Sequence, residues 1–267
     1  MQEQIFKGLV GGKEITIKTG KFAQSANASC LIQCGETVLL ATAVMSKEVK
    51  PGMGYFPLMV DYEEKLYAAG RIKGSRFVKR EGRPTDEAVL VSRFIDRAIR
   101  PLFDDRITNE VQVMVTALAF DGENDPDILG LIGASCVLHM SDIPWNGPIG
   151  AVRISKSQND EWLINPTYQE RKTTKFDLDI AGTPEKIVMI EARAKEAPEE
   201  EIYNAFQTGR QYLKEAIDLI EKVRTATGKE KKDVISPKTE EEKLKQERKE
   251  EIEKIAEEFA TPLFLEA

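Results

Sequence analysis

The sequence contains a single histidine, His139, and only three cysteines among its 267 residues. Nucleophilic catalysis through a Ser/His/Asp or Cys/His arrangement needs a histidine as base, and this one lies in the apolar stretch SCVLHM, where packing is the simpler role. Cys30, Cys34 and Cys136 have apolar neighbours and do not form a metal-site spacing with the histidine, so we expect reduced, buried thiols.

Long apolar runs and an N-terminal signal-peptide pattern are also missing, and we therefore expect a cytoplasmic protein with no membrane partner. An overall excess of positive charge is missing too, because the formal net charge is -7. This balance argues against a protein that coats nucleic acid through bulk charge. A local basic patch can still bind a polyanion, since the field near a surface is set by nearby charges.

The residues that are present suffice for a folded core, with 41% apolar and 31% charged residues of both signs. Short β-rich segments bounded by glycine and polar turns predict strands at 14–20, 29–35, 37–44, 56–63 and 111–120. Two further strand pairs are expected at 150–155 with 161–166 and at 176–183 with 186–194. Paired strands with interleaved helices indicate an α+β fold.

Three helices are expected in the same region. Thr85 suits the N-cap of the first, Pro101 closes it, and Leu90, Phe94, Ile95, Ala98 and Ile99 are expected to form its apolar face. The second covers 126–140, with Pro126 in its first turn. The third covers 198–223 and ends near Gly228.

A change of composition marks the end of this region. We expect a core domain over 1–228, a charged linker over 229–239 and the start of an all-helical domain over 240–267, which continues in a longer natural protein.

The stretch RIKGSRFVKREGRP between the fourth predicted strand and the first helix is strongly cationic. Its basic residues are Arg71, Lys73, Arg76, Lys79, Arg80 and Arg83. One interpretation is that they solvate the loop. The other is a single-stranded nucleic-acid site, because the cations can hold phosphates while Phe77 stacks on a base and the glycines allow movement.

Several longer stretches of the sequence are specific enough to indicate a family. The block YFPLMVDYEEKLYAAGRIKGSRFVKREGRPTDEAVLVSRFIDRAIRPLF closely resembles the first ribonuclease PH-like core of the bacterial polynucleotide phosphorylase family, and TGKFAQSANASCLIQCGETVLLATAV, WNGPIGAVRI and FDLDIAGT do so in family order. The resemblance runs from about Phe6 to Gly228, and the tail after Ser236 resembles the start of that family's helical domain. It implies a ribonuclease PH-like core of the ribosomal protein S5 domain 2-like class.

The resemblance also implies an activity and an assembly. Members of the family are phosphorolytic 3′→5′ exoribonucleases, or polyribonucleotide nucleotidyltransferases, of mRNA degradation that form homotrimeric rings. The implied partners are single-stranded RNA, inorganic phosphate and a decay complex with a helicase or an endonuclease. Mg²⁺ or Mn²⁺ is expected at a second core that follows in the longer protein, and none in this chain.

Carried over by position, the family's loop motif of paired aromatic and paired basic residues falls on Phe77, Val78, Lys79 and Arg80. Val78 stands where a second Phe is usual, and Lys79 stands where Arg is common. The RNA-binding residues implied by the resemblance are Arg76, Phe77, Lys79, Arg80 and Arg83.

No catalytic residue is expected in this chain. Active cores of the superfamily open their second helix with a small Ser/Thr-rich loop that seats phosphate, since a helix N-terminus offers free N–H groups. Here the loop reads DGENDPDI, and its acids Asp121, Glu123, Asp125 and Asp127 are expected to cap the helix and repel phosphate.

No metal ligand is expected either. Where active relatives place two aspartates and a lysine, this chain has Arg171, Asp177 and Asp179. We expect Asp177 and Asp179 to be solvent-facing positions of an alternating strand.

Arg83 falls where active relatives place a phosphate-binding arginine, and Arg93, Arg97 and Arg100 share a nearby helix face. These three are candidates for contact with an anion or RNA, and the alternative is that they pair with local acids and hold the ring together. Two other functions stay open: a non-catalytic RNA-binding ring subunit of an exosome-like complex, and an unrelated enzyme that binds a small anion through these arginines.

Overall fold

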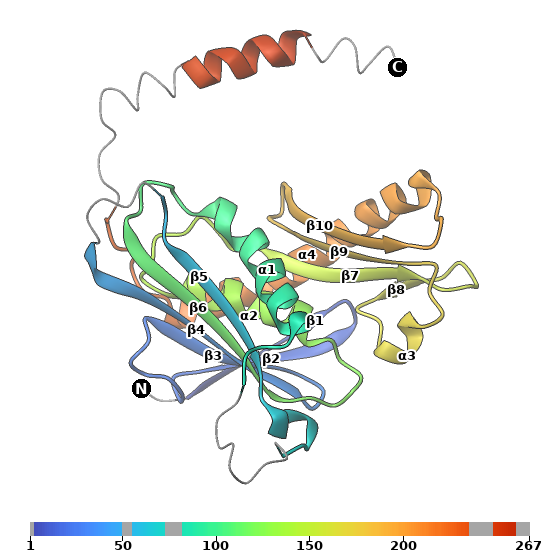
Figure 1. Ribbon diagram of the computed structural model, residues 1–267, viewed down its shortest axis with the longest axis horizontal. Coiled ribbons are helices and arrows are strands. Elements are labelled where there is room, and N and C mark those ends of the chain that lie inside the picture. Colours follow the sequence, from blue (N-terminus) through green and yellow to red (C-terminus); the bar gives the residue numbers. More distant parts are fainter. Residues whose placement is uncertain (1–2, 50–54, 73–81, 235–247, 260–267) are drawn as a thin grey trace. The chain divides into compact units, whose positions relative to one another are not determined.

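The computed structural model describes residues 3–49, 55–72, 82–234 and 248–259 of the chain, which Figure 1 colours along the sequence. Contacts divide the chain into two units, Met1–Val234 and Ile235–Ala267. In the second unit, residues 248–259 form a helix whose side chains are exposed. No helix in the described part of the chain is both long and apolar enough to cross a membrane.

The first unit contains a six-stranded sheet in the order β1-β2-β3-β4-β6-β5. The bounds of its strands are Gln4–Val10, Lys13–Thr19, Ala28–Cys34, Thr37–Val49, Leu58–Glu64 and Asn109–Ala119 for β1 to β6. All neighbours are antiparallel except β5 and β6, which run parallel and are joined through helix α1. Five of these strands agree with the sequence expectations, whereas β1 has no counterpart among them.

A second sheet has four strands in the order β10-β9-β7-β8 and is antiparallel throughout. Its strands are Gly150–Lys156 (β7), Trp162–Ile164 (β8), Phe176–Gly182 (β9) and Ile187–Ala194 (β10). The one-turn helix α3 (Tyr168–Arg171) connects β8 to β9. Both strand pairs expected from the sequence are present, and the α+β class is confirmed.

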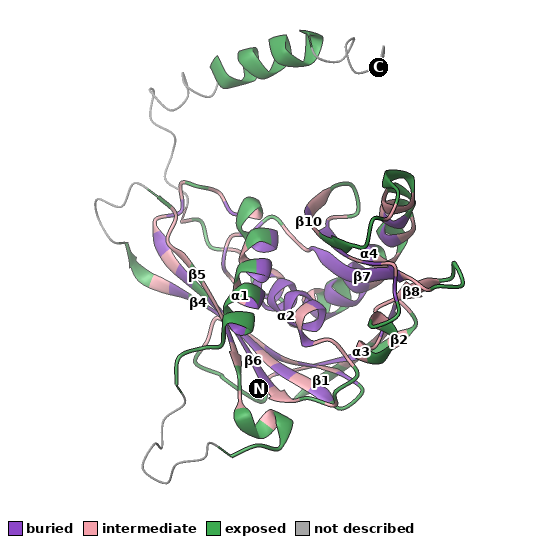
Figure 2. Ribbon diagram, turned by 45° about the vertical axis from the view of Figure 1, so that its right-hand side comes forward, coloured by how far each residue is buried: buried purple, intermediate pink, exposed green. Residues whose placement is uncertain are grey.

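Helix α2 (Pro126–Met140) lies between the two sheets and forms the centre of the core (Figure 1). It contacts β3, β4 and β6 on one side and β7 and helix α4 on the other. Figure 2 shows that it is buried along nearly its whole length. Small residues such as Gly133, which lies against Ile32 and Ala41, allow this close packing. The observed bounds are those expected from the sequence.

Helix α1 (Asp86–Ile99) covers β5 and continues into the 3-10 turn η2 (Arg100–Leu102). The Thr85 hydroxyl accepts a hydrogen bond from the Ala88 backbone N–H at 3.1 Å, so the expected N-cap is confirmed. The expectation that Leu90 belongs to the apolar face is wrong, because its side chain is 62% exposed. The other four expected residues are buried, and Ala88 and Val91 continue this buried stripe toward the start of the helix.

Helix α4 (Glu199–Thr227) packs on β7, β9 and β1. Gly209 permits this approach, because a Cβ there would overlap the side chains of Ile154 and Ile180. The helix ends at Gly228, as the sequence indicates.

The segment after Gly228 is bound to the C-terminal end of α2. The backbone N–H of Lys229 donates to Met140 O at 2.9 Å, and the Lys231 ammonium donates to Leu138 O and Ser141 O at 2.7 and 2.9 Å. Lysines placed there satisfy carbonyl groups that a helix end leaves open. The first unit therefore extends beyond α4 to Val234.

The scarce residue types have structural roles. The Nε2 atom of His139 lies 3.1 Å from Glu221 Oε1 between α2 and α4, and burial, opposed by the Glu221 charge, lowers the pKa of His139. All three cysteines are free and buried. The expectations of a packed histidine and buried thiols are confirmed.

Candidate functional site

The cationic loop connects the 3-10 turn η1 (Leu66–Ala69) to α1. η1 ends at Gly70, whose φ of 66° lies in the left-handed region that glycine adopts without strain. Among the predicted RNA-binding residues, Arg76, Phe77, Lys79 and Arg80 lie outside the described residues. The structure describes Arg83 only.

Arg83 is exposed and lines, together with Arg71, a hollow of about 680 Å³ beside β5. Asp61, Glu63 and Glu64 of β5 line the same hollow. The two described ends of the loop thus meet at a surface of mixed charge. Carboxylates there weaken the attraction of the two arginines for a distant anion, because opposite charges within one hollow offset each other's field.

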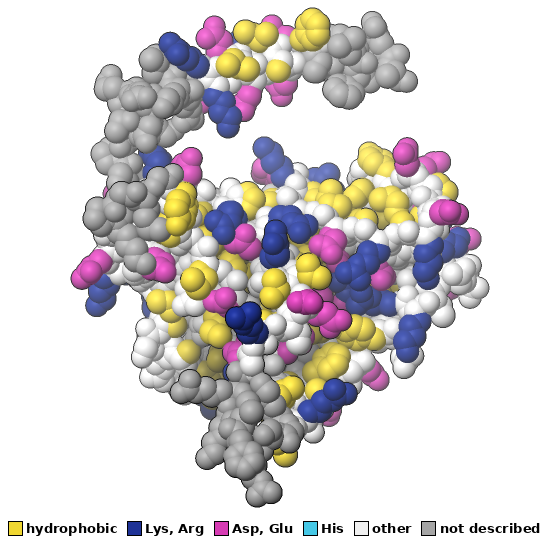
Figure 3. Space-filling view, in the orientation of Figure 1, with side chains coloured by type: hydrophobic (Ala, Val, Ile, Leu, Met, Phe, Trp, Pro, Cys, Tyr) yellow, Lys and Arg dark blue, Asp and Glu magenta, His cyan; other side chains and the backbone are white. Residues whose placement is uncertain are grey.

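Arg93, Arg97 and Arg100 are all exposed on α1, where Figure 3 shows basic and acidic side chains interspersed. Arg100 donates to Asp96 Oδ1 at 2.6 Å and Oδ2 at 2.9 Å. The Nη1 atom of Arg97 lies 3.5 Å from Glu191 Oε2 on β10. Arg93 has no ion-pair partner within the described ranges. Local acids thus pair with Arg97 and Arg100, whereas Arg93 pairs with no acid in the described ranges.

The start of α2 is capped by its own acids, as the sequence indicates. Asp125 occupies the N-cap, and its Oδ1 accepts from the Asp127 backbone N–H at 3.0 Å. Asp121 closes the preceding loop by accepting from the Glu123 and Asn124 N–H groups, each at 2.8 Å. The N–H groups of Glu123, Asn124 and Asp127 are therefore engaged by carboxylates at the place where a phosphate would be seated.

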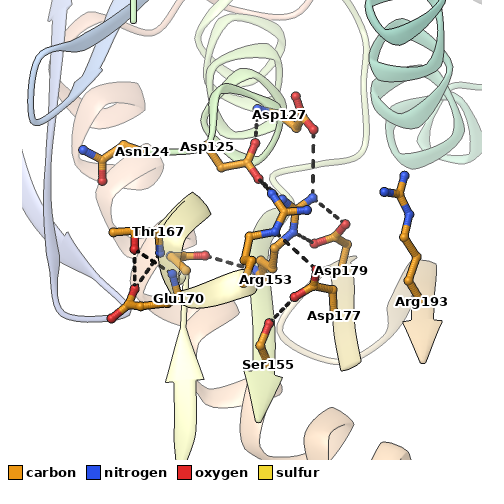
Figure 4. Close-up of polar contacts among 12 residues, drawn as sticks. Asn124, Asp125, Asp127, Arg153, Ser155, Thr167, Glu170, Asp177, Asp179 and Arg193 are labelled. Atoms are coloured by element: carbon orange, nitrogen blue, oxygen red, sulfur yellow. Dashed lines mark hydrogen bonds and ion pairs between the residues drawn. The ribbon is translucent and has the colours of Figure 1, made fainter. Parts of the chain in front are cut away.

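Arg153 of β7 lies beneath this helix start, and the sequence expectations do not include it. It is 5% exposed, and its guanidinium contacts Asp125 of α2 and Asp179 of β9 (Figure 4). The Nη2 atom donates to Asp179 Oδ2 at 2.7 Å, and Asp127 Oδ2 is 3.9 Å from the same nitrogen. One buried arginine thus joins the first turn of α2 to two strands of the second sheet.

A second arginine completes the cluster. Arg171, at the end of α3, donates from Nη1 to Asp125 Oδ2 at 2.8 Å and from Nε to Asp177 Oδ2 at 3.3 Å. The Ser155 hydroxyl donates to Asp177 Oδ1 at 2.5 Å, and the Arg171 guanidinium lies 5.2 Å from the centre of the Tyr168 ring. We name Arg153, Arg171, Asp125, Asp177 and Asp179 the arginine–aspartate cluster.

The electrostatic state of nearby acids follows from this packing. Burial, followed by the charge of Asp179, raises the pKa of Asp127 to about 7. Burial also opposes ionisation of Asp121, but hydrogen bonds from the backbone and side chain of Asn124 outweigh it and hold the pKa of Asp121 well below its usual range. Close to the same helix cap, the pKa of Asp127 is thus raised and the pKa of Asp121 is lowered.

The expectation that Asp177 and Asp179 face solvent is wrong. Asp179 is 7% exposed and Asp177 is half-buried, because β9 lies between β7 and β10, packs against α4, and has arginine and serine partners on its neighbours. The register sets Arg153 opposite Asp179 and Ser155 opposite Asp177. A usable signal was present: the otherwise apolar strands GAVRIS and FDLDIAG carry charges that need partners once buried.

The cluster does not fit a divalent metal ion. Both carboxylate oxygens of Asp179 accept from Arg153, and both of Asp177 accept from Ser155 or Arg171, so arginine N–H groups occupy positions that a magnesium ion would need. In the described part of the chain, no group of three or more His, Cys, Asp or Glu residues is arranged to hold a metal.

Comparison with known proteins agrees with this architecture. The model of the 3′ exoribonuclease family, domain 1, matches residues 11–144, and the model of domain 2 matches residues 147–212. Among curated proteins, the polyribonucleotide nucleotidyltransferase of Heliobacterium modesticaldum is 46% identical over 231 residues, which cover 86% of this chain and 32% of that protein. The corresponding protein of Maricaulis maris is 48% identical over 219 residues, covering 82% of this chain and 31% of that protein.

The chain spans about a third of the length of the curated relatives it matches. Among solved structures, the crystal structure of rice Rrp46 superposes with a TM-score of 0.63 at 10% identity, covering 78% of this chain and 92% of that one. This likeness shows the ribonuclease PH-like fold alone. With both family domains matched in sequence and the fold seen independently, the chain belongs to the 3′ exoribonuclease family of ribonuclease PH-like proteins.

Proposed function

We propose that the chain is the N-terminal part of a phosphate-dependent 3′→5′ exoribonuclease, a polyribonucleotide nucleotidyltransferase, and that this part guides RNA and builds a trimeric ring without carrying the active site. The family membership and the names of relatives at 46–48% identity support the enzyme class. Localisation in the cytoplasm, action in mRNA degradation and association with a helicase or an endonuclease belong to the same proposal, and rest on the polynucleotide phosphorylase resemblance.

The proposal that this chain carries no active site rests on the arginine–aspartate cluster at the start of α2. Phosphorolysis needs an attacking phosphate held by free N–H groups and cations, and a metal or acid that stabilises the departing oxygen. At this helix start Asp125 accepts the Asp127 N–H, and Arg153 is already bound by carboxylates. The cations point to protein acids, so a phosphate dianion would have to displace a buried carboxylate.

The reaction proposed for the longer protein balances as follows. An oxygen of inorganic phosphate attacks the phosphorus of the 3′-terminal phosphodiester, the bond to the preceding nucleotide's O3′ breaks, and that oxygen takes up a proton. The products are a nucleoside diphosphate and an RNA one residue shorter. Mg²⁺ or Mn²⁺ is proposed at the second core, where it would stabilise charge on the leaving oxygen.

The proposed contribution of this chain is to hold single-stranded RNA through the loop residues Arg76, Phe77, Lys79, Arg80 and Arg83. Cationic side chains bind phosphates, and a phenyl ring adds about 1–3 kcal/mol for each stacked base. Affinity should fall steeply with salt because neutralised phosphates release counterions. The exposed guanidinium of Arg93, on the helix that follows the loop, is a further candidate contact.

Two measurements on the 267-residue chain test the proposal. With phosphate and Mg²⁺, we expect the chain to leave the length of a 5′-labelled oligoribonucleotide unchanged and therefore to release no nucleoside diphosphate. The Maricaulis maris relative serves as the positive control. Phosphate-dependent shortening of the RNA by the chain alone would contradict the proposal that this chain carries no active site.

The second measurement addresses RNA binding. The double variant Lys79→Ala, Arg80→Ala should weaken binding of a single-stranded oligonucleotide about tenfold at low salt, since two phosphate contacts are lost. The matched control is Lys214→Ala, Lys222→Ala, which removes the same charge from exposed positions of α4. Equal affinities of the two double variants would show that the loop is not the contact.

The other functions left open by the sequence are less well supported. Membership of the 3′ exoribonuclease family excludes an unrelated small-anion enzyme. An exosome-like ring subunit is not favoured, because the likeness to Rrp46 is at 10% identity and concerns the fold, whereas the relatives at 46–48% identity are named polyribonucleotide nucleotidyltransferase.

A further inference from the structure

A second hollow of about 450 Å³ opens beside the start of α2 and is lined there by Pro126 and by Phe120 and Gly122 of the preceding loop. It adjoins the hollow beside β5, with which it shares Glu64. It is formed by the ends of β5 and β6, the turn η1, the first turn of α1 and α3. Its lining residues are Tyr62, Glu64, Lys65, Ala68, Ala69, Glu87, Ala117, Phe120, Gly122, Pro126 and Tyr168. Neither the family comparison nor the function proposed above assigns it a ligand.

The floor of this hollow holds a polar atom without a partner. Tyr62 is 2% exposed, and its hydroxyl oxygen has no hydrogen-bond partner in the described part of the chain. Burial, followed by the charges of Asp127 and Glu64, raises the pKa of this phenol well above its usual range, so the hydroxyl is protonated at neutral pH. A buried hydroxyl normally has a partner, and this one is an unpaired polar atom of a residue in the wall of the hollow.

Three carboxyl groups face the same space. Glu64 of β5 and Glu87 of α1 line the hollow, and burial together with the Glu87 charge raises the pKa of Glu64. Asp127 adjoins the hollow through Pro126; its charge raises the pKa of Tyr62 and Tyr168, and the charge of Glu64 in turn contributes to the raised pKa of Asp127. Neighbouring carboxylates therefore disfavour the ionised forms of Glu64 and Asp127, and a cation placed among these acids would relieve that repulsion.

Basic side chains near the hollow form ion pairs with acids that do not line it. Lys65 lines it, but its ammonium donates to Glu63 at 2.7 Å. Arg171 is bound to Asp125 and Asp177, and Arg193 of β10 lowers the pKa of Asp127 without lining the hollow. The lining of the hollow itself carries two carboxylates and one lysine, while Arg71 and Arg83 lie in the adjoining hollow that shares Glu64.

Aromatic rings supply the remaining wall. Phe120 and Tyr168 meet edge to face with ring centres 5.8 Å apart, and Phe120 is 38% exposed. The face of an aromatic ring attracts an ammonium group, while the alanines Ala68, Ala69 and Ala117 offer an apolar surface to a methylene chain. Acid, ring and alkyl surfaces together match a flexible organic cation.

We propose that this hollow binds an aliphatic polyamine, with one ammonium group between Glu64 and Glu87, a second toward Asp127 and the Tyr62 hydroxyl, and the methylene chain along Phe120 and the alanines. An inorganic or nucleotide phosphate would meet three carboxylates. A neutral base would remove those carboxylates from water without compensating their charge. The inference goes beyond the function proposed above and does not depend on it.

The test is calorimetric titration of the 267-residue chain with spermidine, 1,4-diaminobutane and butylamine at fixed ionic strength. Saturable binding of one spermidine is expected, with the diamine at least about tenfold tighter than the monoamine, because only the diamine can reach both acidic ends. Glu64→Gln and Glu87→Gln should each weaken spermidine binding about tenfold, and Tyr62→Phe about fivefold. Glu161→Gln, an exposed position on the turn between β7 and β8, removes the same charge and should change nothing.

The outcomes separate clearly. A loss confined to the hollow variants supports the site, and Glu87→Gln tests it even if a substitution at buried Tyr62 impairs folding. Absence of saturable spermidine binding overturns the proposal, as does equal weakening by Glu161→Gln, which would indicate diffuse attraction to an acidic chain. Binding of adenosine in place of spermidine would also overturn it and would identify a nucleobase site.

Discussion

The arginines of α1 lie at the surface, whereas the arginines beneath α2 lie among carboxylates inside the fold. Arg93, Arg97 and Arg100 are exposed, and Arg97 and Arg100 have partners that are themselves in contact with water. Arg153 and Arg171 are held among Asp125, Asp177 and Asp179 away from solvent. The comparison teaches that charge on this protein has two uses: the outer arginines are exposed at the surface, while the inner ones bind the four-stranded sheet and α3 to the start of the central helix.

The largest effect is expected from removing the inner arginine. Arg153→Met leaves Asp125 and Asp179 buried without their shared partner, and should lower the free energy of unfolding by about 3–5 kcal/mol. Urea denaturation followed by circular dichroism measures this change. The variant Arg153→Met, Asp179→Leu should recover part of the loss, because one unpaired charge is removed as well. A change below about 1 kcal/mol for the single variant would show that the cluster does not stabilise the fold.

An intermediate effect is expected from the pH dependence of Asp127. Its folded-state pKa of about 7 lies above the unfolded value, so its ionisation in the folded state is penalised, and the protein loses stability as pH rises from about 4 through 7. Asp127→Asn should remove this loss and gain at least about 1 kcal/mol relative to the parent between pH 5 and pH 8, since one pKa unit corresponds to about 1.4 kcal/mol. If the free energies of unfolding of parent and variant differ by the same amount at pH 5 and at pH 8, the pKa of Asp127 is not raised.

The smallest effect on stability is expected from the outer arginines. The double variant Arg93→Gln, Arg97→Gln should change the free energy of unfolding by no more than about 0.5 kcal/mol, because exposed ion pairs contribute little. Its affinity for single-stranded RNA should fall a few-fold, with a shallower dependence on salt. Fluorescence anisotropy of a labelled oligonucleotide at two salt concentrations measures both. If the unfolding free energy falls as far as in Arg153→Met, the division between outer and inner arginines is wrong.

Features set by local chemistry could be predicted from the sequence. The bounds of α2 follow from Pro126 and a run of small and apolar residues, and the start of α1 follows from the Thr85 cap. The strand pairs of the second sheet follow from alternation and turns. In each case the determining residues lie within a few positions of the feature that they fix.

Features set by distant partners could not. Asp179 in isolation fits a solvent-facing position, and only the pairing of β9 with β7 shows that it is buried opposite Arg153. Leu90 fits the apolar face of an isolated helix, yet the sheet beneath α1 selects Val91. The hollow beside Tyr62 combines residues from β5, α1, β6 and α3, so no single stretch of sequence reveals it.

The lysine contacts after Gly228 have a mechanical consequence. Lys229 and Lys231 attach the outgoing chain to the carbonyl end of α2, which is the most deeply packed helix of the unit. A pull on the chain beyond Val234 would have to break these contacts before it could unwind the last turn of α4. Tension on this segment would therefore act on the end of α2 as well as on α4, to which Arg224 also attaches it.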